Sequence, residues 1–138
     1  MVISRIVALG RIVIDEVRPR TPSGDHPAKV VAGQPFAVSA DVFADGHDLL
    51  AARAVLAGHP DGPRSVAPLS ATGNDRFEGW LTTNVIGRQE LVVEAWRDRW
   101  ASWVARVSTL ESAGEDLSVD LEEGAQLLQM AAGRSPGT

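Results

Sequence analysis

The sequence predicts an antiparallel, immunoglobulin-like β-sandwich followed by a C-terminal α-helix. Short β-prone runs recur at a spacing of roughly 8–12 residues, and Gly- and Pro-rich turns separate them. We expect no alternation of strands with helices among these runs, and the character of the sequence changes only after Leu110. Cysteine and tyrosine are absent, so "immunoglobulin-like" describes the architecture alone, without the disulfide or tyrosine corner of antibody domains.

Apolar and polar residues alternate along the predicted strands, as in a sheet with one buried face. Pro68 predicts a short edge strand, because proline cannot donate a hydrogen bond to a sheet. Residues 1–9 are expected to be an N-terminal tail or a strand extension, 10–112 the sandwich domain, and 113–138 the start of a truncated helical insert. The expected strands outside the central hairpin cover residues 12–17, 29–32, 36–43, 53–57, 65–69 and 76–82.

Residues 88–107 are predicted to form a β-hairpin around which the chain is organised. The first strand ends at Trp96, the turn is Arg97-Asp98-Arg99, and the second strand alternates apolar and polar residues from Trp103 onward. Three of the four tryptophans lie here, so we expect the core to be built against this hairpin. We expect Trp96 and Trp103 to pack in that core and Trp100 to lie at the turn.

The final segment carries an amphipathic helical pattern from Leu117 onward. Leu121, Ala125, Leu128 and Ala132 recur at steps of three and four, and the helix begins with acidic residues. An isolated helix of this length is marginal in water. It is therefore expected to dock on the sandwich, to pair with another copy, or to begin a larger helical element.

Composition excludes several functional classes. The formal net charge is −5, which disfavours a nucleic-acid partner. No apolar run approaches the roughly 20 residues of a membrane span, and residues 1–9 lack the features of a signal peptide, which predicts a cytoplasmic location. Without cysteine there is no disulfide, zinc-thiolate site or thiol catalysis.

No motif assembles a catalytic centre, so we predict no catalytic residue, no cofactor and no metal. Asp45-Gly46-His47-Asp48 suggests metal ligands but is better explained as a turn. The carboxylate pairs Asp15/Glu16, Asp41/Asp45 and Glu122/Glu123 are adjacent or nearby in sequence and are interpreted as solvated surface. Neither a nucleophile elbow nor a glycine-rich phosphate loop is present.

The tryptophans offer the strongest candidate surface. Trp80, Trp100 and Trp103 are predicted as an interface or a platform for glucan rings, against the alternative that they pack inside the protein. An exposed aromatic residue in an apolar patch marks a protein interface more often than a sugar site.

Several segments, in order, resemble the N-terminal domain of the bacterial α-1,4-glucan:maltose-1-phosphate maltosyltransferases, of the α-amylase superfamily. Gly10-Arg11-Ile12 and Pro27-Ala28-Lys29 are similar to the opening of that domain. The resemblance extends over roughly residues 10 to 132. Its other segments are residues 42–48, residues 93–98 with Trp103 following, and residues 121–128.

The resemblance implies an N-terminal β-sandwich with a helical insert, followed by a catalytic (β/α)₈ barrel. It also implies a homodimeric enzyme that transfers maltosyl units from maltose 1-phosphate with retention, through an Asp nucleophile and a Glu acid/base. The barrel is not in this sequence, so no catalytic residue is transferred. We expect an excised or truncated piece, with an unpaired sheet edge that favours self-association.

These observations predict a non-catalytic scaffold and dimerisation domain. Its partners are expected to be a second copy of the chain and, through the catalytic domain alone, α-glucan and maltose 1-phosphate. The alternative is an α-glucan-binding β-sandwich module.

Overall fold

The computed structural model describes residues 2–8, 11–24, 26–46, 48–59 and 61–134. The described residues form two compact units. We call residues up to 46, together with 50–96, the sandwich unit; residues 48–49 and 97–134 form the helical unit.

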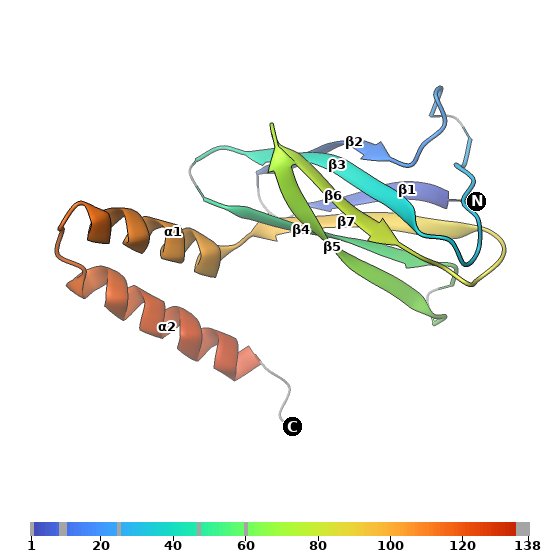
Figure 1. The fold of residues 1–138 in the computed structure, drawn as a ribbon. Coiled ribbons are helices and arrows are strands. Elements are labelled where there is room, and N and C mark those ends of the chain that lie inside the picture. The colour runs from blue at the N-terminus through green and yellow to red at the C-terminus, as the bar shows by residue number, and fades with distance from the viewer. Residues whose placement is uncertain (1, 9–10, 25, 47, 60, 135–138) are drawn as a thin grey trace. The chain divides into compact units, whose positions relative to one another are not determined.

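The sandwich unit contains the seven strands found in the described residues (Figure 1). Their order is β1-β7-β4-β5-β6-β3-β2, and the pairs β2–β3, β3–β6, β5–β6 and β4–β5 are antiparallel. The strands are β1 (Val2–Ala8), β2 (Ile12–Arg18), β3 (Phe36–Ala44), β4 (Leu50–Ala57), β5 (Arg64–Gly73), β6 (Arg76–Leu81) and β7 (Gln89–Arg97). The predicted mainly antiparallel β-sandwich with a C-terminal helix is confirmed.

The first strand differs from the rest of the sheet. β1 runs parallel to β7, with Val2 opposite Gln89 and Ala8 opposite Ala95 (Figure 1). The predicted strand over residues 29–32 is wrong, because this region contributes only an isolated bridge between Ala28 and Val2.

Strand β5 belongs to both halves of the sandwich. Its first part, Arg64–Leu69, pairs with β4, and its last part, from Ser70, pairs with β6. The edge strand predicted over residues 65–69 pairs with β4 alone, but the strand is longer than predicted and pairs with β6 from Ser70 onward. Gly79 on β6 allows the two strands to approach here, because a Cβ at that position would lie 2.6 Å from the Pro68 carbonyl oxygen.

The core is aliphatic and follows the predicted period of two. Alternate residues of β3, β4 and β7 are buried, and the largest fully buried side chains are Leu56, Leu91, Val38, Val42 and Val93. The prediction that tryptophan packs in this core is wrong. Trp96 is only half-buried and lies 5.7 Å from the Arg53 guanidinium in a cation–π contact.

The predicted hairpin is also wrong in its second half, which is helix α1 (Arg99–Ser112). Asp98 is the N-cap of α1, since its Oδ1 accepts a hydrogen bond from the Ala101 N–H at 2.9 Å. The spacing of Trp100, Trp103, Val107 and Leu110 is three or four residues, which suits a helix. The alternation of apolar and polar residues from Trp103 to Ser108 was therefore misleading.

Helix α1 ends in a Schellman motif. Gly114 has φ +71°, its N–H donates to the Glu111 carbonyl at 3.0 Å, and the Glu115 N–H donates to the Leu110 carbonyl at 3.0 Å. Glycine adopts this left-handed conformation without a steric penalty. The chain then enters α2 (Ser118–Arg134), which confirms the predicted C-terminal helix.

Helices α1 and α2 pack through a face of α2 that we did not predict. Gly124 is buried against the Trp103 ring, and Leu127 is half-buried. The Trp103 indole N–H donates to the Asp120 carbonyl. The predicted stripe is instead exposed, with Leu121 at 54% and Leu128 at 56% of their maximal accessible surface.

Candidate functional site

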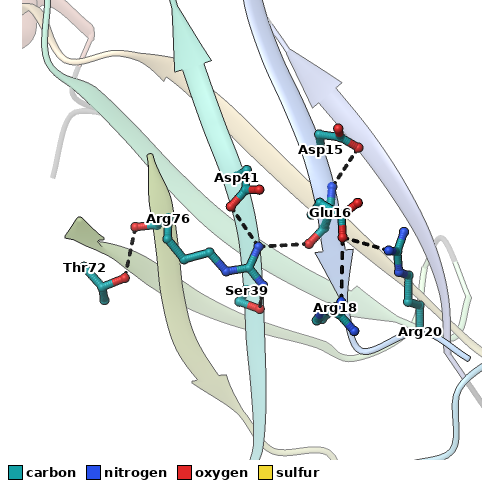
Figure 2. A network of polar contacts seen from close by, with 8 residues as sticks. All are labelled: Asp15, Glu16, Arg18, Arg20, Ser39, Asp41, Thr72 and Arg76. Atoms are coloured by element: carbon teal, nitrogen blue, oxygen red, sulfur yellow. Dashed lines mark hydrogen bonds and ion pairs between the residues drawn. The ribbon is translucent and has the colours of Figure 1, made fainter. Parts of the chain in front are cut away.

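The clearest polar constellation of the sandwich unit surrounds Arg76 on the outward face of β6, β3 and β2 (Figure 2). The Arg76 Nη1 donates to Asp41 Oδ1 at 2.9 Å and to the Glu16 carbonyl at 3.1 Å. Its Nη2 donates to the Ser39 hydroxyl. One guanidinium therefore joins three strands, and its side chain is only 23% exposed.

The β2 side of this network is irregular. Glu16 has φ +50°, and the β2–β3 register shifts between Asp15 and Arg18. The Glu16 carboxylate accepts a hydrogen bond from Arg20 at 2.7 Å and lies 3.7 Å from the Arg18 guanidinium (Figure 2). The network thus stabilises a β-bulge at the outer strand of the sheet order.

Two carboxylates of this face lie opposite each other. Asp15 and Asp41 are register partners across β2 and β3. Asp15 Oδ1 accepts from the Glu16 N–H at 2.8 Å, and Asp41 is paired with Arg76. Glycoside hydrolysis needs two carboxylates on either side of a bond held in a cleft. Here the Asp15 carboxylate accepts a backbone hydrogen bond and the Asp41 carboxylate pairs with Arg76. Both lie on an open sheet face.

A shallow groove of about 330 Å³ lies on the outward side of β4 and β7. Its floor is small and apolar, with Val55, Ala57 and Val92, and Glu90 and Glu94 lie on β7. Four residues of strand place the Cα atoms of these glutamates about 13 Å apart. Glu94 is also paired with Arg53. The groove therefore does not present a facing pair of carboxylates.

A second cavity, of about 420 Å³, lies beside the loop from Thr82 to Arg88. Thr83 and Gln89 line it, are each only 5% exposed, and hydrogen-bond to each other at 3.0 Å. Gln89 Nε2 also donates to the Val85 carbonyl at 2.8 Å, which fixes the loop. The loop tip presents Ile86, whose side chain is 89% exposed. We call this region the loop pocket.

Two of the three predicted tryptophan candidates lie in the same unit and contact each other. Trp80 is in the sandwich unit, whereas Trp100 and Trp103 are in the helical unit. Trp100 and Trp103 stack on each other, with ring centroids 4.9 Å apart and an interplanar angle of 27°. Trp100 is 43% exposed and Trp80 is 67% exposed.

The exposure of Trp80 had a signal in the sequence that we did not use. Arg76, Glu78 and Trp80 alternate with Phe77 and Leu81 on β6, and the last two are buried. Trp80 therefore shares its face with charged residues.

No group of three or more His, Cys, Asp or Glu side chains suited to a metal occurs within the described residues. The histidine of the Asp45–Asp48 turn, His47, lies outside them. Within the same part of the chain, neither helix has the length and apolar character needed to cross a membrane.

Comparison with known proteins identifies the family. A family model described as "Alpha-1,4-glucan:maltose-1-phosphate maltosyltransferase, domain N/S" matches residues 10–137. The chain belongs to this family. This result agrees with the resemblance carried by the segments between residues 10 and 132.

Individual relatives agree with the family match. The chain is 38% identical over 135 residues to alpha-1,4-glucan:maltose-1-phosphate maltosyltransferase 1 of Streptomyces coelicolor, covering 96% of this chain and 20% of the relative. It is 39% identical over 133 residues to the Arcanobacterium haemolyticum enzyme, covering 94% of this chain and 19% of the relative. The Myxococcus xanthus enzyme is 37% identical over 133 residues, and the alignment covers 92% of this chain and 20% of the relative. The chain thus spans about a fifth of the length of these relatives.

Proposed function

We propose that this chain is the non-catalytic scaffold and dimerisation domain of a cytoplasmic maltosyltransferase that extends α-1,4-glucans from maltose 1-phosphate. The observation that carries the proposal is the family match over residues 10–137. The relatives bear the name of this activity, and their remaining four-fifths leave room for a separate catalytic part.

The polar groups of the sandwich unit support a structural role. Arg76 joins three strands, Glu94 pairs with Arg53, and Gln89 and Thr83 fix a loop. Each interaction positions backbone or side chains of this chain, and none of them surrounds a cleft with converging reactive groups.

Exposed apolar side chains support an association role. On α2, Leu121 and Leu128 are more than half exposed and lie on the stripe with Ala125 and Ala132. A stripe at steps of three and four is the seam by which helices pack against other helices. Such a stripe needs a covering partner, and a second copy supplies one.

The catalytic half of the proposal is tested with maltose 1-phosphate and a maltooligosaccharide. We expect this chain to release no inorganic phosphate above the rate of a protein-free control. Sustained phosphate release that scales with the concentration of the chain would overturn the non-catalytic role.

The association half is tested by sedimentation velocity over a hundredfold range of concentration. We expect a reversible dimer that Leu128→Glu weakens by at least tenfold. Val119→Glu is the matched control, because Val119 is 78% exposed on the same helix but lies off the stripe. A monomer at every concentration, or equal effects of the two substitutions, contradicts dimerisation through α2.

A further inference from the structure

Trp80 presents an open indole ring on the outward face of the sandwich unit. It is 67% exposed, and its register partner on β3 is Ala37, a small side chain. On the other side, Pro68 of β5 lies against Gly79, the neighbour of Trp80. No ring stacking or cation–π contact involves Trp80 within the described residues. Small flanking residues therefore leave the ring accessible.

A hydrogen-bond acceptor lies next to this ring. Glu78 is on the same face of β6, about 6.6 Å along the strand. Its carboxylate forms no ion pair or side-chain hydrogen bond with the described residues, and its register partners Ser39 and Ser70 are short. Arg76 lies two residues from Glu78 on β6, where its guanidinium pairs with Asp41 and donates to the Ser39 hydroxyl.

The other tryptophans are less suited to receive a ligand. Trp100 and Trp103 cover each other by stacking, and Trp103 is further held by Asp120 and Gly124. Trp96 has the Arg53 guanidinium over its ring. Among the four tryptophans, only Trp80 has a ring that is free of such contacts with the described residues and a carboxylate beside it.

We propose that Trp80 and Glu78 form a binding site for the pyranose rings of an α-1,4-glucan. The apolar C–H face of a sugar ring lies on the indole, and a sugar hydroxyl donates a hydrogen bond to the Glu78 carboxylate. This ligand class rests on the proposed function, in which the chain is part of an enzyme that extends such glucans.

The surroundings favour a sugar over two other occupants. A cation would meet one aromatic face in open water, where cation–π attraction is weak. A protein interface would call for a contiguous apolar patch, whereas the apolar neighbours of Trp80 on the adjacent strands are the small residues Ala37 and Pro68. The next position along β6 is the charged Glu78, with Ser39 and Ser70 on either side of it. A neutral ligand with an apolar face and many hydroxyls matches both the ring and the polar border.

The test follows the Trp80 indole N–H signal by NMR while maltoheptaose is titrated into the 138-residue chain. A single-ring platform predicts a dissociation constant on the order of 1 mM, with the largest shift at Trp80. Trp80→Ala should weaken binding at least tenfold, Glu78→Gln severalfold, and Trp80→Phe less than Trp80→Ala. Phe43→Ala is the matched control, because Phe43 is another exposed aromatic residue on the outward face and should leave binding unchanged.

Three results would overturn the site. The first is the absence of a saturable shift up to a maltoheptaose concentration 10-fold above the expected dissociation constant. The second is an affinity of Trp80→Ala for maltoheptaose equal to that of the unsubstituted chain. The third is a shift of the Trp80 signal that free arginine, or a higher protein concentration, produces without the sugar. Each leaves the scaffold proposal intact, since phosphate release and sedimentation test that proposal separately.

Discussion

The packing of Trp103 on Gly124 makes a sharp prediction about the helical unit. In Gly124→Ala, the added Cβ would lie 2.5 Å from Cε2 and 2.8 Å from Cη2 of the Trp103 ring. The ring cannot move away freely, because its N–H is bonded to the Asp120 carbonyl. The helices must separate or the indole must leave its place.

The expected change in the free energy of unfolding is the balance of opposing effects. Overpacking costs about 1–3 kcal/mol, and loss of the indole hydrogen bond costs about 1 kcal/mol. Replacing a helical glycine with alanine returns up to about 1 kcal/mol. We therefore expect Gly124→Ala to lower the free energy of unfolding of the helical unit by about 1–3 kcal/mol.

The matched control is Gly133→Ala in the same helix. No atom lies within 4 Å of a Cβ at Gly133, so only the helix propensity changes, and stability should rise by about 0.5–1 kcal/mol. Urea unfolding followed by circular dichroism at 222 nm and by tryptophan fluorescence measures both variants. If the two substitutions shift the midpoint in the same direction, the proposed Trp103–Gly124 packing is refuted.

Three further predictions concern single contacts. Asp98→Ala removes the N-cap of α1 and should cost about 1 kcal/mol, with less helix signal at 222 nm and an unchanged strand signal. Gly79→Ala places a Cβ 2.6 Å from the Pro68 carbonyl oxygen and should cost the sandwich unit about 1–3 kcal/mol in thermal or urea unfolding. Hydrogen bonds from the Ser118 hydroxyl and then from its N–H lower the pKa of Asp116. Its contribution to the start of α2 should therefore be complete above about pH 3.9 and fade as the pH falls through the lower folded pKa, as followed by carboxyl NMR.

Each of these has a contrary result. An unchanged helix signal in Asp98→Ala would exclude the cap. Wild-type stability in Gly79→Ala would mean that β5 and β6 can separate at this point without loss. For Asp116, Ser118→Ala should raise the carboxyl pKa toward its ordinary value, and an unmoved titration would exclude Ser118 as the cause.

Much of the sandwich could be predicted because its strands keep a period of two. Val38, Ala40 and Val42 are buried in β3, and Phe77 and Leu81 are buried in β6, as the alternation required. These patterns are local and need no knowledge of the partner strand. The parallel pairing of β1 with β7 could not be seen in this way, because it joins residues almost 90 positions apart.

The second strand of the hairpin was wrongly predicted because the apolar residues among 100–110 fit both the period of two of a strand and the three-to-four-residue spacing of a helix. Trp103 and Val107 fit both the alternating and the helical pattern, and Asp98 decides between them by capping a helix. The packing face of α2 was wrongly predicted for another reason. Periodicity counts apolar side chains, whereas the closest packing uses the absence of one at Gly124.

The sequence allowed the exposed aromatic candidates to be selected but not ranked. Trp80, Trp100 and Trp103 were selected for their type, but which of them is open depends on the fold around each ring. Glu78 shares a face with Trp80 because the two lie two residues apart on β6, which the alternation in the sequence indicates. Ala37 comes beside Trp80 only through strand register, which residue types alone do not specify.

The placement of β5 has a consequence for how the sandwich unit opens. Because one continuous strand supplies hydrogen-bond partners to β4 at its start and to β6 at its end, unfolding of β5 removes hydrogen-bond partners from both strands at once. Amide protons on β4 and β6 should then exchange with deuterium at a common, slow rate, so that the two layers melt as one cooperative body.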